Sequence, residues 1–315
     1  SKVKKRLQAP PLPYNLSSLQ IDAAKRFGMS AKTVLDTCQS LYERHKLLTY
    51  PRSDSRYLPV EHLKESSAVL AAIKNNSAAL ANAVSDADTS LVSKAWNDKK
   101  VQAHHAIIPT ARKMDTSKLN QAERNVYELA ARQYLIQFYP HHETQESQIE
   151  LIIAGGIFIA KASESLKPGW KQLFPTKNEK TNEKKNEDKV ANKTSQQDAA
   201  LNSHLPVMKK GDICSSEAAE ILSKETSPPK PFDDASLLAA MTGIARYVKD
   251  AEIRKVLKET DGLGTEATRA SIIELLFTRA FLQRQGKTIR STPAGKGLIN
   301  SLPAMATTPD MTAQW

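Results

Sequence analysis

Apolar residues recur at helical spacing soon after the start of the chain. A Pro-Pro-Leu-Pro run forces an extended initial segment, so residues 1–13 are expected to lie outside any helix. Polar caps and apolar spacing then predict one helix over residues 15–27 and a second from Ala31 to about Arg44, which Ser30 can cap. Gly28 opens the short turn between them. Two helices joined in this way are typical of a helix-turn-helix unit.

The middle of the chain changes from helical to strand-like periodicity. A long helix is expected over residues 119–138, where a following proline ends it. Two β-rich runs, residues 147–154 and 157–160, flank a Gly-Gly pair and predict a hairpin. The Gly169-Trp170 pair is expected to open a further strand.

The last part of the chain begins with a strongly polar tract. Residues 176–203 have almost no large apolar side chain, and we interpret them as a disordered insert in the β region; a surface helix held by charge pairs is the alternative. Helical spacing returns over residues 233–248, 251–260 and 265–278. A small hairpin is predicted over residues 281–292, and a helix followed by such a hairpin has the outline of a winged helix.

The charge balance points to a polyanionic partner. The 315 residues are enough for two or three domains, and they carry 45 Lys+Arg against 34 Asp+Glu, a formal net charge of +11. The polar tract from Lys177 to Lys193 holds six lysines and four acids, a net charge of only +2. The basic excess therefore lies mostly in segments that are expected to fold, which favours a polyanionic partner; a basic protein without such a partner is the alternative.

Several other classes are disfavoured by composition. Cys38 and Cys214 are far apart without metal-ligand spacing, which indicates a reducing, cytoplasmic setting and no zinc site. No apolar run approaches the roughly 18 residues of a membrane span, and the basic start is not a signal peptide. The chain has no initiator Met and ends at Trp315 without a helix stop signal, so we expect a fragment. Because no heptad pattern is present, a monomer is the default expectation.

The segment from Leu48 to Pro59 places a tyrosine beside two arginines and a carboxylate, directly after the predicted helix-turn-helix. A phenol has a pKa of about 10 and is a weak nucleophile at neutral pH. Arg52 can stabilise phenolate character on Tyr50 and charge on an attacked phosphate. Arg56 can hold a flanking phosphate, and Asp54 can orient Arg52. The alternative is a charged turn with an ordinary tyrosine.

A pair of histidines precedes an apolar run between Ala103 and Thr110. His104 can lie at the edge of the core, face the tyrosine, and contact the scissile phosphate or assist proton transfer. His105 is the weaker candidate. A structural histidine is the alternative interpretation.

A glycine-containing loop runs from Asp261 to Arg269. Its glycines permit unusual backbone angles, and Thr265 can cap the following helix. A helix N-terminus with hydroxyl groups and an arginine suits a DNA phosphate. A simple helix cap is the alternative.

The three motifs together, in this order and at roughly this spacing, resemble those of type IA DNA topoisomerases. The segment from Pro228 to Met241 is similar to the topoisomerase III branch of that family. The resemblance covers about Pro10 to Trp315, apart from the polar insert. It implies an ATP-independent isomerase that relaxes negative supercoils and decatenates DNA. In that family a tyrosine attacks single-stranded DNA and becomes joined to the 5′-phosphate, the other strand passes through the gap, and religation follows.

The resemblance also implies roles for particular residues. Tyr50 matches the nucleophile, Arg52 the arginine that stabilises the transition state, and His104 the histidine near the scissile phosphate. Thr268 matches a threonine that contacts the strand leading into the scissile site. The residues expected to contact DNA are Thr49, Ser53, Asp54, Arg56, Thr265, Glu266, Thr268 and Arg269.

The implied fold is a multi-domain α+β toroid, mainly helical, with helix-turn-helix and winged-helix-like units and a β-arch. Residues 1–13 match the end of the β-arch, and residues 14–140 match the helical domain that bears the tyrosine. Residues 141–227 match the arch and hinge, and residues 228–315 match a truncated winged-helix-like domain that binds single-stranded DNA.

The family places an acidic Toprim domain before this stretch, in which a Glu and an Asp-x-Asp motif bind Mg²⁺. The Asp-x-Asp of this chain, Asp86-Ala87-Asp88, lies in a polar context and not after a buried strand. We therefore expect no metal site in the chain, Mg²⁺ bound by the Toprim domain of the complete enzyme, and poor cleavage by the chain alone.

Three other functions compete with this interpretation. The main rival is an inactive truncated module that only binds single-stranded DNA, and a covalent adduct at Tyr50 would separate the two. A tyrosine recombinase needs an arginine and histidine set upstream of a late tyrosine, whereas Tyr50 is early. A duplex-reading regulator leaves His104 and the glycine-containing loop without a role.

Overall fold

The computed structural model describes residues 2–174, 205–259 and 262–311, and the polar insert predicted over residues 176–203 lies outside them. The chain divides into two compact units. The first comprises residues 1–11 and 136–227, and the second comprises residues 12–135 and 228–315. In the described residues the first unit holds a small antiparallel sheet and 3-10 turns, and the second holds α-helices and a two-stranded sheet. Together they confirm the expected α+β class.

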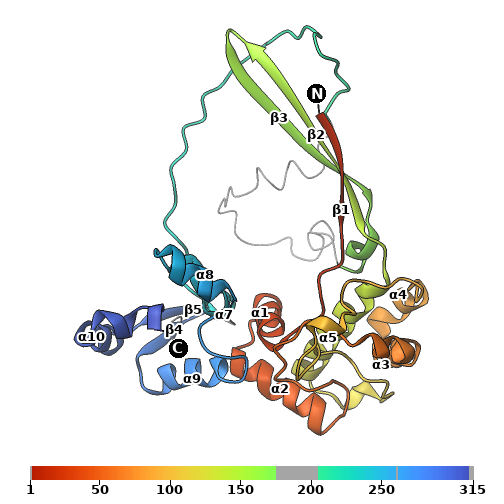
Figure 1. Ribbon diagram of the computed structural model, residues 1–315, viewed down its shortest axis with the longest axis vertical. Helices are drawn as coiled ribbons and strands as arrows, with labels where there is room; N and C mark the ends of the chain where they lie inside the picture. Colours follow the sequence, from red (N-terminus) through yellow and green to blue (C-terminus); the bar gives the residue numbers. More distant parts are fainter. Residues whose placement is uncertain (1, 175–204, 260–261, 312–315) are drawn as a thin grey trace, which may run out of the picture. The chain divides into compact units, whose positions relative to one another are not determined.

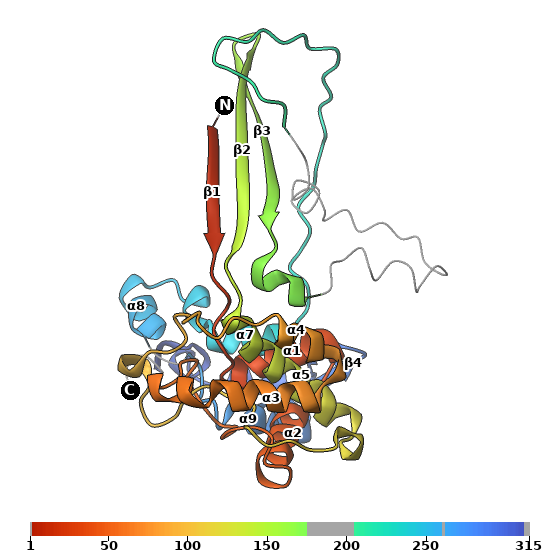
Figure 2. The ribbon, with the colours of Figure 1, turned by 90° about the vertical axis from the view of Figure 1, so that its right-hand side faces the viewer.

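The first unit is built on a three-stranded antiparallel sheet in which β2 lies between β1 and β3 (Figures 1 and 2). The strands are β1 (Lys2–Gln8), β2 (His142–Ile153) and β3 (Gly156–Lys167). β1 lies opposite residues 142–148 of β2. The chain reverses at Ala154 and Gly155, whose φ values of 48° and 80° match a type I′ hairpin turn. The hairpin prediction is confirmed, with strands longer than predicted.

The Gly169-Trp170 pair opens a 3-10 turn, η6 (Gly169–Leu173), where a strand was predicted. Gly169 has a φ of 52°, and a Cβ there would lie 2.3 Å from the carbonyl oxygen of His141. Only glycine fits this close approach. The buried Trp170 then donates its indole N–H to the carbonyl oxygen of Gln8 at 2.9 Å, which ties the turn to the end of β1. Another 3-10 turn in the described part of the first unit is η5 (Ile136–Phe138).

The second unit is mainly helical over its described residues, with one two-stranded hairpin. Its α-helices are α1 (Leu16–Phe27), α2 (Ala31–Glu43), α3 (Ser66–Asn76), α4 (Ala81–Ser85), α5 (Gln121–Leu135), α7 (Asp234–Thr242), α8 (Ala251–Glu259), α9 (Arg269–Thr278) and α10 (Pro293–Ser301). Its 3-10 turns are η1 (Val60–Glu65), η2 (Ala78–Leu80), η3 (Asp98–Lys100), η4 (Thr116–Lys118), η9 (Ile244–Tyr247) and η10 (Ala304–Thr307). The hairpin consists of β4 (Leu282–Gln285) and β5 (Thr288–Ser291), as predicted.

Local capping signals set the first two helices. The Asn15 side chain accepts the backbone N–H of Ser18 in a capping box, and α1 ends at Gly28 with a φ of 68°. Ser30 caps α2, and Arg44 is its C-cap. Both predicted helices are therefore confirmed.

The C-terminal helices differ from the prediction at two points. The run predicted over residues 233–248 breaks at Gly243, which separates α7 from η9. The helix predicted from Thr265 begins at Arg269 instead, because residues 265–268 form a turn in which the Thr268 N–H donates to the Thr265 carbonyl at 3.1 Å. Thr265 is thus the first residue of this turn and not the helix N-cap.

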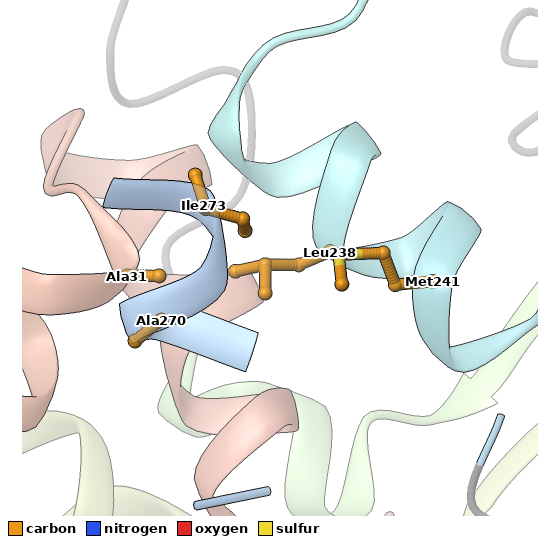
Figure 3. Packing of buried hydrophobic residues seen from close by; sticks show 5 residues of the cluster. All are labelled: Ala31, Leu238, Met241, Ala270 and Ile273. Atoms are coloured by element: carbon orange, nitrogen blue, oxygen red, sulfur yellow. The ribbon is translucent and has the colours of Figure 1, made fainter. Parts of the chain in front are cut away.

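An apolar cluster packs α2, α7 and α9 together in the second unit, and Figure 3 shows its side chains directed toward one another. The cluster consists of Ala31, Leu238, Met241, Ala270 and Ile273. It holds two segments that are far apart in the sequence against each other.

Leu238→Ala is expected to lower the free energy of unfolding by about 2–5 kcal/mol, because it leaves a cavity where Leu238 is fully buried. Urea denaturation followed by circular dichroism would measure the loss. Leu298→Ala is the matched control, since Leu298 is 39% exposed on α10 and should cost much less. Equal losses at both positions would contradict the assigned core.

Candidate active site around Tyr50

Tyr50 lies in a loop whose start is held by a short β-like pairing. The segment ending in Thr49 pairs with the buried run around Ile107 and Ile108: the Thr49 N–H donates to the Ile108 carbonyl at 3.0 Å, and Leu48 bridges to Pro109. Apolar and β-branched residues favour this extended, buried geometry. The pairing brings the predicted tyrosine and histidine motifs together.

The Tyr50 ring is held by two aromatic neighbours and is still 40% exposed. The His104 ring stacks on it with a centroid distance of 4.8 Å and an interplanar angle of 19°. Tyr42 on α2 contacts it edge-on at 5.9 Å and 86°. The phenol ring therefore has a defined position at the surface of the second unit.

Asp54 faces His104. The Asp54 Oδ1 lies 3.8 Å from the His104 Nδ1, and both side chains are substantially exposed. The expectation that Asp54 orients Arg52 is not met, because the structure gives Asp54 an ion pair with His104 and none with Arg52 in the part of the chain it describes. Asp54 is instead placed to orient the imidazole beside the tyrosine.

Arg52 is exposed and lines an open groove of about 520 Å³ between α2 and α9. The groove also presents Lys32 from α2 and the hydroxyls of Ser271 and Thr278 from α9. Two acids also line the groove: Asp36, which pairs with Lys32 at 2.6 Å, and Glu274. The positive and negative side chains of the lining therefore balance. Arg52 thus places a guanidinium group between the tyrosine loop and the groove along α9.

Three of the loop residues predicted to contact DNA use their side chains internally. The Thr49 hydroxyl donates to the Ala106 carbonyl at 3.2 Å and accepts the Ile108 N–H at 3.0 Å. Ser53 is fully buried, and its hydroxyl accepts the N–H of Ser55 at 3.1 Å. Direct DNA contact by the buried Ser53 hydroxyl does not fit this geometry.

The third of these residues, Arg56, braces the extended segment before α1. Its guanidinium donates to the carbonyl oxygens of Leu12 at 2.8 Å and Pro13 at 2.9 Å. Burial lowers the pKa of Arg56 from its ordinary value, while Tyr14 and Tyr57 act in the opposite direction. Arg56 therefore stabilises the tyrosine loop by fixing it to the extended segment before α1.

The loop over residues 262–268 has both accessible and buried side chains. Gly262 has a φ of 85°, and a Cβ there would lie 2.5 Å from the Met241 carbonyl oxygen, so the loop needs glycine at this point. Thr265 and Thr268 are exposed, and their hydroxyls lie 2.9 Å apart. Glu266 and Arg269 are buried, contrary to the expectation that they contact DNA directly. Their side chains are surrounded by protein groups.

Sequence reasoning missed two groups that shape the site. Tyr42 lies on the partly buried side of α2, and no local signal marks it as a neighbour of Tyr50. Asn15 caps α1, but its amide also donates to the Asp54 carbonyl at 3.3 Å and to Glu266 Oε1 at 3.2 Å. These contacts join residues that are distant in sequence, which local patterns do not reveal.

His105 lies beside the site, and its burial is expected to make the stability of the fold depend on pH. Burial lowers its pKa, the backbone bond to Ala106 opposes this shift, and His62 and His104 add to it. Since the unfolded chain then binds the proton more readily, acidification below the unfolded pKa of about 6.5 favours unfolding. When the pH is lowered from about 7.5 to about 5, we expect the melting temperature of the His105→Gln variant to fall less than that of wild type. An equal fall in melting temperature for the variant and for wild type in thermal denaturation would contradict this expectation.

The described part of the chain offers no Mg²⁺ site. No group of three or more His, Cys, Asp or Glu side chains is placed to hold a metal ion among these residues. Asp86 follows α4, and the Asp88 carboxylate accepts the N–H and hydroxyl of Ser90 at 2.9 and 2.6 Å.

None of the described helices has the length and apolar character needed to cross a membrane.

Comparison with known proteins identifies the family to which this chain belongs. A family model described as DNA topoisomerase matches residues 1–315. The chain belongs to the bacterial DNA topoisomerase family, which confirms the resemblance to the type IA enzymes.

Within that family the similarity lies with the topoisomerase 3 branch. The chain is 54% identical over 310 residues to DNA topoisomerase 3 of Vibrio cholerae, covering 98% of this chain and 45% of that protein. It is 35% identical over 324 residues to DNA topoisomerase 3 of Bacillus subtilis, covering 100% of this chain and 42% of that protein. The chain thus spans less than half the length of these relatives.

A solved structure shares the fold. The full-length topoisomerase I of Thermotoga maritima aligns with a TM-score of 0.63 at 19% identity, over 99% of this chain and 46% of that chain. The arrangement of helices and small sheets described above is therefore similar to that of a type IA topoisomerase.

Proposed function

We propose that the chain carries the tyrosine side of a type IA topoisomerase active site. The Tyr50 hydroxyl gives its proton to solvent water, and its oxygen attacks the phosphorus of a phosphodiester in single-stranded DNA. A bond forms between Tyr50 and the 5′-phosphate, the bond to the 3′-oxygen breaks, and the 3′-oxygen takes up a proton from solvent water. Another strand passes through the gap, and the 3′-hydroxyl then attacks the phosphotyrosine and releases Tyr50. No ATP is needed, because the phosphotyrosine bond retains the energy of the cleaved phosphodiester.

The observation that carries this proposal is the exposed Tyr50 ring held between His104 and Tyr42. A nucleophile must be accessible and fixed in position for in-line attack, and both conditions hold here. Arg52 stabilises the charge that develops on the attacked phosphate. His104, with Asp54 beside its Nδ1, contacts the same phosphate.

The DNA strand contacts the exposed hydroxyl groups of Thr265 and Thr268 and the groove beside Arg52. Thr49, Ser53 and Arg56 support this surface through their internal hydrogen bonds.

The finer architecture follows the same assignment. The pair α1 and α2 acts as a helix-turn-helix unit, and α9 with β4, β5 and α10 acts as a winged-helix-like unit that binds single-stranded DNA. The strands β1 to β3 belong to the β-arch of a toroid. Domain boundaries near residues 14, 141 and 228 are proposed on this basis.

The partners follow from the family. We assign single-stranded DNA as the substrate, with relaxation of negative supercoils and decatenation as the outcome. Mg²⁺ is supplied by a Toprim domain, since the described residues do not fit a metal site. A monomer acting on DNA in the bacterial cytoplasm is the proposed setting.

A labelled oligonucleotide tests the proposal. A single-stranded oligonucleotide labelled at its 3′ end is incubated with the chain and Mg²⁺, with and without a Toprim domain added as a separate polypeptide, and resolved on a denaturing gel. A labelled protein band is the expected result, because the 5′-phosphotyrosine link retains the 3′ label. Binding of the oligonucleotide without a band in either arm would favour a module that only binds DNA.

A further inference from the structure

Two oppositely charged side chains lie in the interior of the second unit, close to the proposed strand-binding loop. Arg269 is 0% exposed and Glu266 is 7% exposed. Burying charged groups is costly unless they are paired and hydrogen-bonded. Direct DNA contact would need accessible side chains, so their contacts point to another role.

Glu266 caps a helix that lies far from it in the sequence. Its carboxylate accepts the backbone N–H of Ser17, in the first turn of α1, at 2.5 Å. It also accepts the Asn15 amide at 3.2 Å and the Arg269 Nη1 at 2.9 Å. A carboxylate at a helix N-terminus is favoured by the free N–H groups and by the helix dipole. Glu266 therefore fixes its loop to the start of α1.

Arg269 ties the same loop to the same helix. Its guanidinium donates to the carbonyl oxygens of Leu263 at 3.1 Å and Gly264 at 2.8 Å, and to the Ser17 hydroxyl at 2.7 Å. Because the guanidinium is planar and rigid, these bonds define the path of the loop that presents Thr265 and Thr268.

The start of α1 also holds the tyrosine loop. The Leu16 N–H donates to the Ser53 carbonyl at 3.0 Å, and the Asn15 amide donates to the Asp54 carbonyl at 3.3 Å. The Asn15 amide thus contacts both loops, one through Asp54 and the other through Glu266. A continuous set of hydrogen bonds runs from Arg269 through Glu266 and Asn15 to the carbonyl of Asp54, four residues after Tyr50.

We propose that Glu266 and Arg269 are positioning residues that hold the 262–268 loop at a fixed distance from the Tyr50 loop. The inference rests on the proposed function, because it assigns the two loops to one DNA strand. The buried ion pair sets the position of the threonine hydroxyls relative to the tyrosine oxygen. If the ion pair were lost, the DNA strand would still bind, but its phosphate would be displaced from the position needed for attack by Tyr50.

The test compares Arg269→Met and Glu266→Gln with wild type in the 3′-label adduct assay, with the Toprim domain added. The misplaced strand should lower the rate of adduct formation by about 100-fold, while the dissociation constant for the oligonucleotide stays within about threefold. Arg269→Lys should recover part of the rate, because it keeps the charge but not the planar fork. Arg124→Met on α5 is the matched control, since Arg124 also donates to a backbone carbonyl but lies in another part of the unit.

Hydrogen exchange supplies a readout that does not depend on chemistry. Arg269→Met should raise amide exchange over residues 50–58 as well as over residues 262–269, whereas a local structural role would affect only the second range. If Arg269→Met does not fold, Ser17→Ala removes one bond to the guanidinium and keeps the charged pair.

The outcomes are distinct. An unchanged adduct rate, or a fall in rate matched by an equal loss of DNA affinity, would overturn the positioning role. Should wild type form no adduct, the proposed function fails. The exchange experiment then still decides whether the two loops are coupled: faster exchange over residues 50–58 upholds the coupling, and unchanged exchange there rejects it.

Discussion

Replacing Tyr50 with phenylalanine is expected to abolish the covalent DNA adduct and leave binding of single-stranded DNA intact. Phenylalanine keeps the ring that stacks on His104 and contacts Tyr42, so the local packing should survive. It removes only the oxygen that attacks phosphorus. Loss of a nucleophile lowers rates by more than about 10⁴-fold, which is below detection in a gel assay.

The comparison needs a control for general effects of a lost hydroxyl. Tyr247→Phe serves this purpose, because Tyr247 is also exposed but lies on η9, away from the aromatic pair. Fluorescence anisotropy with the same oligonucleotide would verify that both variants bind DNA. A labelled band that persists in Tyr50→Phe would show that another residue is the nucleophile.

Arg52→Ala is expected to reduce the rate of adduct formation by about 10²–10³-fold with little change in DNA affinity. Arg52 follows Tyr50 closely and is exposed on the groove between α2 and α9, where it can approach the attacked phosphate. Its charge matters most when negative charge builds up in the transition state, so the loss should appear in the rate and not in binding. Arg52→Lys should recover part of the rate, because lysine keeps the charge but lacks the bidentate fork.

Arg44→Ala tests whether any nearby positive charge would have the same effect. Arg44 is exposed at the C-terminal end of α2 and lies outside the groove lining. Its loss should weaken DNA binding only slightly. The size of this loss should change smoothly with salt concentration, as expected for a general phosphate contact. Equal losses of rate for Arg44→Ala and Arg52→Ala would argue against a specific role for Arg52.

Long-range contacts explain where sequence reasoning about the site fell short. The aspartate of the tyrosine motif was expected beside Arg52, its close neighbour in the chain, but it faces His104. The helix predicted from Thr265 begins at Arg269, because a hydroxyl-rich turn competes with the first helical turn. In both cases local proximity was a poor guide to the side chain's partner.

Local signals determined much of this protein from the sequence alone. The caps of α1 and α2, the turn of the β2–β3 hairpin and the small β4–β5 hairpin depend on residues within a few positions of one another. The three motifs were also sufficient to indicate the family, because each is a short contiguous segment.

Only the tertiary structure decided which residues of those motifs are accessible. Tyr50 and Thr268 remain exposed, whereas Ser53, Glu266 and Arg269 are enclosed by groups from distant parts of the chain. Burial and hydrogen-bond partners depend on how far-apart segments pack, as in the bonds between Arg269 and Ser17. Those contacts have no signature in the local pattern of residues, so the division between DNA-facing and supporting side chains became visible only in the folded chain.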